Sequence, residues 1–94
     1  VEVDTQSNEV VRGIPTEGRI SHMVMVSPDG EKLYTANIVS QNVSVIDRAS
    51  GALITQITCG AGSEGLMFTP DGKELWVANQ NAGTITVIDV ATHT

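Results

Sequence analysis

Short apolar runs separated by turn-forming residues occupy most of the chain. Segments of four to seven residues rich in Val, Ile, Leu and Thr are bounded by Gly, Pro, Asn and Asp. Within residues 42–46, Val43 and Val45 fall on one side of an extended chain, and Ser44 and Ile46 on the other. This pattern predicts short β-strands. No stretch keeps the apolar period of an amphipathic helix, so we expect no helix of note.

The same pattern returns after 42 residues. Residues 22–52 align with residues 64–94, and 11 of the 31 aligned positions are identical. The stretch SPDGEKLYTAN, which begins at Ser27, matches TPDGKELWVAN, and further along VSVID matches ITVID. Two matched blocks at one fixed offset, without a gap between them, indicate an internal repeat.

Each repeat contains several expected strands. The predicted strands of the first unit are 22–27, 32–36, 42–46 and 52–58. Those of the second unit are 64–69, 74–78 and 84–88, and an earlier strand lies near 8–14. Residues 1–5 resemble the end of the third strand and its turn, so the chain is expected to begin within a preceding unit.

Two Pro-Asp-Gly turns are expected to join the first and second strands of the units. Pro28 presets the backbone for a type I turn, and Gly30 can take the left-handed conformation that closes the hairpin. Residues 70–72 repeat the same turn. Asp47 begins the turn to the fourth strand, where we expect its carboxylate to accept nearby backbone N–H groups.

Four short antiparallel strands in each repeat predict the blade of a β-propeller, because propeller blades contain four strands in about 40–45 residues. We therefore expect an all-β fold with an incomplete ring in one chain. Residues 1–21 would hold the last two strands of a preceding blade. Residues 22–63 would form a complete blade, and residues 64–94 a second blade without its fourth strand.

The repeat resembles the YVTN family of β-propellers. SPDGEKLYTAN with NVSVIDRASG, and TPDGKELWVAN with TITVIDVAT, follow the family pattern SPDG-x-x-LYV-x-N and TVSVID-x-ATG over nearly the whole chain. Thr35 and Ala36 stand where the family has its name-giving Val and Thr, and Trp76 replaces the Tyr. The resemblance implies a periplasmic, secreted or cell-surface location.

Composition and charge exclude several classes of function. Eleven Asp and Glu against five Lys and Arg argue against a nucleic-acid groove, which needs a basic surface. No apolar run is long enough to span a membrane. Cys59 is the only cysteine, so the chain has neither an internal disulfide nor a CxxC motif. No phosphate loop, zinc-protease motif or nucleophile elbow occurs, and we expect no cofactor and no metal site.

Two blades cannot cover their own outer faces, so the expected partners are further blades. We favour blades of a longer parent chain, with copies of this chain as the alternative. In the second case residues 1–5 repeat residues 86–90, so one strand is redundant at each junction. Exchange would resolve this, with the N-terminal fourth strand of one copy completing the last blade of its neighbour.

Polar residues that recur in both units are expected to be architectural. They are Asn37, Asn79, Asp29, Asp71, Asp47 and Asp89. The equivalent positions that differ are His22 and Glu64, at the start of the innermost strand, where a propeller opens into its channel. Arg19, Ser21 and Ser63 are expected in the loops that approach this mouth.

These five residues are the candidates for binding a protein or a small molecule, although a packed or solvated structural role is the alternative for His22 and Glu64. A single histidine is a poor metal site. We therefore expect a non-enzymatic binding module. The rival is part of a propeller enzyme or cofactor-binding subunit, since related rings include lactonase-like, quinoprotein dehydrogenase and d1-haem propellers. In that case His22 would be the ligand or base.

Overall fold

The computed structural model describes all 94 residues and contains nine strands and no helix. The strands are β1 (Glu2–Asp4), β2 (Glu9–Arg12), β3 (Ser21–Val26), β4 (Lys32–Asn37), β5 (Asn42–Asp47), β6 (Leu53–Thr58), β7 (Ser63–Phe68), β8 (Glu74–Asn79) and β9 (Thr84–Asp89). Every pair of neighbouring strands is antiparallel. The all-β prediction is confirmed. None of the segments forms an apolar helix of membrane-spanning length.

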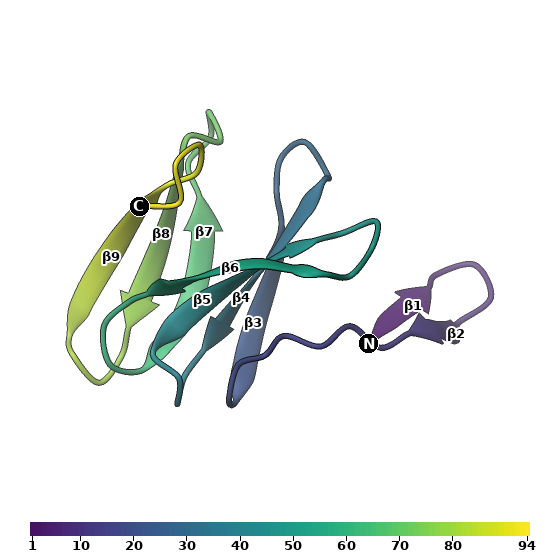
Figure 1. Cartoon of the computed structure of the whole chain (residues 1–94), viewed down its shortest axis with the longest axis horizontal. Helices are drawn as coiled ribbons and strands as arrows, with labels where there is room; N and C mark the ends of the chain where they lie inside the picture. Colours follow the sequence, from purple (N-terminus) through teal and green to yellow (C-terminus); the bar gives the residue numbers. More distant parts are fainter.

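Three sheets follow one another along the chain. They are β1-β2, β3-β4-β5-β6 and β7-β8-β9, each with sequential strands as neighbours. The two larger sheets lie face to face, and the β1–β2 hairpin lies at the opposite end of the molecule from β9 (Figure 1). Strand β9 is the edge of its sheet, whereas its repeat equivalent β5 has β6 on its outer side.

The two Pro-Asp-Gly turns close the β3–β4 and β7–β8 hairpins. Gly30 and Gly72 have φ angles of 77° and 72°, the left-handed region that side chains with a Cβ disfavour. The N–H of Gly30 donates to the carbonyl of Ser27 at 2.8 Å, and Gly72 donates to Thr69 at the same distance. The predicted turn geometry is confirmed at both sites.

Aspartates hold the turns that follow β1, β5 and β9. Asp47 Oδ2 accepts the backbone N–H of Ser50 at 2.8 Å, and Asp89 Oδ1 accepts that of Thr92 at 2.9 Å. Asp4 Oδ1 accepts the N–H of Gln6 in the same way. These contacts are the Asx-type bonds expected at Asp47.

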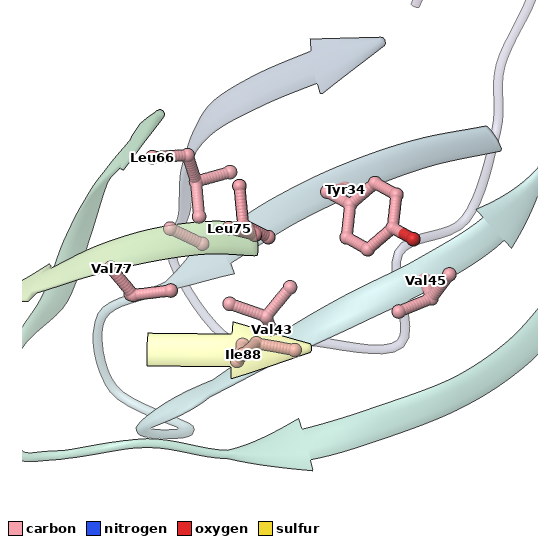
Figure 2. Packing of buried hydrophobic residues seen from close by; sticks show 8 residues of the cluster. Tyr34, Val43, Val45, Leu66, Leu75, Val77 and Ile88 are labelled. Atoms are coloured by element: carbon pink, nitrogen blue, oxygen red, sulfur yellow. The ribbon is translucent and has the colours of Figure 1, made fainter. Parts of the chain in front are cut away.

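The core lies between the two larger sheets. Four residues from β4 and β5 meet four from β7, β8 and β9, namely Tyr34, Ala36, Val43, Val45, Leu66, Leu75, Val77 and Ile88. Figure 2 shows these side chains converging from the two sheets. The ring of Tyr34 meets the ring of Phe68 edge to face, with centroids 5.2 Å apart. Aliphatic packing around one tyrosine therefore joins the two sheets.

Candidate functional site

His22 and Glu64 lie together where the innermost strands of the two sheets begin. Strands β3 and β7 are neighbours across the interface. The Nε2 atom of His22 is 3.8 Å from Oε1 of Glu64, and the side chains are 50% and 34% exposed. The structure thus brings together two residues that the sequence placed only at equivalent repeat positions.

A β-bulge presents each of these two side chains. Ser21 pairs with Asn37 and Met23 pairs with Ala36, so His22 between them is the extra residue of β3. The register of β7 shifts in the same way between Ser63 and Gly65, which leaves Glu64 unpaired. A bulge turns a side chain out of the regular alternation of its strand and is frequent beside binding sites. No turn residue in the sequence signals either bulge, and sequence reasoning missed both.

Ser21 and Ser63 fix the starts of the two strands that carry His22 and Glu64. Both were expected in loops, but they are the first residues of β3 and β7, because each pairs with the last residue of the next strand. Ser21 Oγ donates to Asn37 Oδ1 at 2.7 Å, and Ser63 Oγ donates to the carbonyl of Gly60 at 2.8 Å. These hydroxyls are engaged within the chain and hold the strand starts in place.

Two buried asparagines anchor this end of the sheets. Asn37 donates from Nδ2 to Asn42 Oδ1 at 2.8 Å and to Ser44 Oγ at 2.9 Å. Asn79 repeats the pattern with the hydroxyls of Thr84 and Thr86, at 3.2 and 2.8 Å. Each asparagine thereby ties the second strand of its sheet to the third.

Gly18 and Gly60 leave room for these asparagines. A Cβ at Gly18 would overlap Asn37 Cγ, and one at Gly60 would lie 2.8 Å from Asn79 Cγ. The two glycines are 42 residues apart, one repeat length. That recurrence was a signal available in the sequence, and sequence reasoning did not use it.

Arg19 is held by its backbone rather than by its guanidinium. Its N–H donates to Ser40 Oγ at 2.8 Å, and its carbonyl accepts the N–H of Val39 at 3.2 Å. The guanidinium forms no ion pair with His22 or Glu64. Arg19 is therefore an exposed charge outside the His22–Glu64 pair.

The arrangement lacks the donors that a metal ion needs. No group of three or more His, Cys, Asp or Glu side chains lies close enough to hold one. Cys59 is half-buried beside the core, and burial raises the pKa of its thiol. A protonated thiol is a weak nucleophile at neutral pH. The groups that meet at the starts of β3 and β7 are one imidazole and one carboxylate.

Comparison with solved structures identifies the fold. Over 97% of its length the chain matches 26% of the hydrazine synthase chain from Kuenenia stuttgartiensis, with 31% identity and a TM-score of 0.82. Over 79% of its length it matches 23% of a Bacteroides fragilis protein described as a 6-phosphogluconolactonase, with 30% identity and a TM-score of 0.64. No family model matches the sequence, and a comparison with curated proteins finds no match.

A eukaryotic initiation factor adds a likeness in fold alone. Its identity is 22% and its TM-score 0.65, over 96% of this chain and 24% of that one. The chain spans about a quarter of the length of each of these three structures. It is a β-propeller segment, and the propeller prediction is confirmed. Because the matched structures include enzymes and a non-enzyme, the fold by itself assigns no activity.

Proposed function

We propose that the chain is an arc of a YVTN-type β-propeller and acts as a non-enzymatic binding module outside the cytoplasm. In this proposal residues 1–21 end one blade, residues 22–63 form the next, and residues 64–94 begin a third. The matched motifs in both repeats support the family assignment. The location rests on the family resemblance.

One observation carries the proposal that the chain is an incomplete arc that binds further blades, an apolar sheet face on β7–β9 that faces solvent. Met67 is 69% exposed and Trp76 is 45% exposed, and Ile85 and Val87 continue the same face. Their repeat equivalents in β3–β5 line the core, where Tyr34, which is equivalent to Trp76, is fully buried. A contiguous apolar patch of this kind is typical of a surface that contacts another protein.

The partner of this face is another blade. The equivalent face of the β3–β6 sheet is covered by the β7–β9 sheet within the chain. A groove of about 530 Å³ runs along it, lined on its floor by Trp76, Ala78 and Ile85. Side chains from a further blade would fill this groove as Leu66 and Leu75 fill the space over Tyr34. The further blade belongs to a longer parent chain or to another copy.

The His22–Glu64 pair is the second part of the proposal and would contact a ligand at the mouth of the channel. Both side chains are partly exposed, and both bulges aim at one place. An imidazole can donate or accept a hydrogen bond, and a carboxylate accepts one. The pair suits a protein loop or small molecule that offers a donor next to an acceptor.

Light scattering on the purified chain, with intact mass measured in parallel, tests the binding function. We expect a particle mass above the chain mass of 9.9 kDa at micromolar concentration. Trp76→Ser should shift the particle toward the single-chain mass. Gln80→Ser, an exposed loop change, is the matched control and should not. A folded wild-type monomer with sharp cooperative unfolding would contradict the proposal.

Part of a propeller enzyme is the second candidate, and the 3.8 Å approach of His22 to Glu64 favours it. A carboxylate beside an imidazole can orient it as a base. The assay is hydrolysis of a phosphorylated sugar lactone by the wild type and by His22→Ala. The binding module predicts no hydrolysis above the uncatalysed rate. Turnover that His22→Ala abolishes would favour the enzyme instead.

A further inference from the structure

We infer that the His22–Glu64 pair binds an organic cation with N–H donors, an alkylammonium or guanidinium group, and that protonation of His22 releases this cation. The inference rests on the proposed ligand contact at this pair. It adds the chemical class of the ligand and the regulation of its binding. Both residues belong to neighbouring strands of one chain, β3 and β7, so the site is formed within the chain itself.

The polar atoms of both side chains are free to bind a ligand. The hydroxyls of Ser21 and Ser63, one residue before each of them, are engaged with Asn37 and with the carbonyl of Gly60. His22 and Glu64, by contrast, form no side-chain hydrogen bond within the chain, and their contact with each other is the one polar contact that they make. Both are partly exposed, so water satisfies them and a ligand with suitable donors can displace that water.

The distance between the two groups suits a donor that both can share. His22 Nε2 and Glu64 Oε1 are 3.8 Å apart, which is longer than a hydrogen bond of about 2.7–3.2 Å. The two atoms therefore do not bond each other directly. Neutral His22 with its proton on Nδ1 presents Nε2 as an acceptor, and the ionised carboxylate of Glu64 is an acceptor only. Two acceptors at this spacing select a group with two or more N–H donors, which ammonium and guanidinium groups have.

The charge of the site favours a cation over a neutral or anionic ligand. With His22 neutral, the pair carries the negative charge of Glu64, and the whole chain has a formal net charge of −6 at pH 7. The only basic side chain in the loops that lead into β3 and β7 is Arg19, whose guanidinium forms no ion pair with Glu64. A hydrogen bond between a charged donor and a carboxylate is roughly twice as strong as one between neutral groups. The ligand that gains most from this site is therefore a cation.

The other titratable groups at this end of the sheets are few. The loop before β3 carries Glu17 and Arg19, and the loop before β7 carries only the half-buried Cys59. The turns that follow β4 and β8 at the same end contain no titratable side chain. Val1 borders a hollow beside His22, so its amino group is acetylated in any test of this site. With that amine blocked, His22 is the residue at this end whose type changes charge between about pH 5 and about pH 8.

Protonation of His22 removes the properties that select the cation. The imidazolium has no acceptor nitrogen, and it forms an ion pair with Glu64 within the chain. A ligand cation would then meet a carboxylate that is already paired and a positive charge beside it. Proton and ligand therefore compete for the site. The affinity for a cation should be highest where His22 is neutral and should fall as the pH decreases from about 8 to about 5.

NMR titration of the N-terminally acetylated chain with n-butylammonium tests the ligand class. Butyrate and n-butanol are the matched probes, with the charge reversed or removed. At about pH 8 we expect the ammonium to shift the amide resonances at the starts of β3 and β7, and the other two probes to leave them unchanged. Glu64→Gln should weaken the binding about tenfold or more, because it removes a hydrogen bond to a charged group. Glu9→Gln, a change in β2, is the matched control and should leave the affinity unchanged.

A second titration at about pH 5 tests the regulation. The affinity of the wild type for butylammonium should fall about fivefold, the scale of an exposed ion pair that the ligand must break. His22→Gln cannot gain the proton and should bind the cation equally at both pH values. An equal fall in wild type and His22→Gln would assign the effect to protonation of Glu64 and overturn the role of His22.

A short lysine peptide with blocked ends presents the same butylammonium group and separates the two sources of the cation. Tighter binding of the peptide than of the free amine would assign a protein side chain, and equal binding a small molecule. Equal binding of butyrate would overturn the cation assignment and leave a ligand contact at the pair standing. Absence of binding by every probe would overturn the whole inference. The proposed binding of further blades is judged separately, by the light scattering of the wild type and Trp76→Ser.

Discussion

Gly60 and Asn79 show how closely single residues are fitted at the inner end of the sheets. The amide of Asn79 is almost fully buried, and its hydrogen-bonding atoms all have partners within the chain. The Asn79 side chain occupies the space that a Cβ at Gly60 would need. No buried side-chain nitrogen or oxygen in the chain lacks a partner. Satisfied buried polar groups specify one arrangement of their neighbours, since any displacement leaves one unpaired.

Gly60→Ala should therefore be destabilising. The new Cβ would lie 2.8 Å from Asn79 Cγ, so the asparagine or the loop must shift. We expect a loss of about 1–3 kcal/mol in the free energy of unfolding, the usual range for overpacking. Urea denaturation measures it. Gly13→Ala is the control, because a Cβ there has no atom within 4 Å, and an equal loss in both variants would contradict the packing argument.

The turn aspartates should make stability depend on acid pH. The Ser27 hydroxyl, and then the Glu31 N–H, lower the pKa of Asp29 from its ordinary value of 3.8. The hydroxyl of Thr69 does the same to Asp71. Because the folded pKa is below the unfolded one, the carboxylates stabilise the fold above pH 3.8. That contribution is lost as the pH falls through the lower folded pKa.

Thermal unfolding followed at about pH 6 and about pH 2.5 measures this loss. The wild-type Tm should fall between the two conditions. Asp29→Asn with Asp71→Asn should start lower at the higher pH and show a smaller fall. Glu9→Gln is the control, since that carboxylate accepts no hydrogen bond within the chain and the change should leave the fall intact. An equal fall in the double variant would contradict the assignment.

The sequence predicted the role of the residues that recur in both repeats. It did not predict which of the residues that differ between the repeats lie close together. The recurrence of Asn37 and Asn79 marked them as architectural, and both are buried hydrogen-bonding centres. His22 and Glu64 could be placed at equivalent positions, yet their 3.8 Å approach depends on two bulges and on how the sheets face each other. The hydroxyl bond of Ser63 to Gly60 likewise needs the loop conformation.

The hairpin turns are the elements whose geometry follows most directly from their residues. Pro28, Asp29 and Gly30 each suit one position of the turn. The observed φ of 77° at Gly30 lies in the left-handed region, which glycine adopts most easily at the end of such a turn. The ends of the strands were predicted less accurately from the sequence. The strand expected near 8–14 is Glu9–Arg12, because β1 offers only three residues to pair with. Pairing partners, which lie elsewhere in the chain, set where each strand ends.

Gly30→Val should strain the β3–β4 hairpin. A β-branched residue in the left-handed region is unfavourable, and we expect a cost of about 1 kcal/mol or more in the free energy of unfolding. Gly30→Asn is the matched control and should cost less, since asparagine tolerates this conformation, as Asn8 does at a φ of 57°. Denaturant unfolding compares the two. Equal costs would show that side-chain size, rather than φ, limits this position.

At the scale of the whole molecule, the two larger sheets stack and cover one face of each other. The core forms only where two sheets meet, and the outer faces of the stack keep side chains of the same character as the core. This follows from a repeat in which every blade carries both contact surfaces. The sequence could predict the two surfaces from the repeat. It could not predict that β1–β2 copies the register of β5–β6, because a skipped residue depends on pairing.

Trp76 fluorescence reports contact between molecules, because Trp76 is the only tryptophan and lies on the exposed face of β7–β9. Its emission should move to shorter wavelength as the protein concentration rises, since docking removes the indole from water. Val24 and Trp76 are the repeat equivalents of Leu66 and Tyr34, which pack together in the core. Val24→Asp should therefore abolish this shift although Trp76 is unchanged, because a carboxylate would be buried against the indole of a neighbouring copy. Val39→Asp, at a position 40% exposed in a loop, is the control and should keep the shift. A shift that survives Val24→Asp would mean that Trp76 is covered by some surface other than the β3–β4 face.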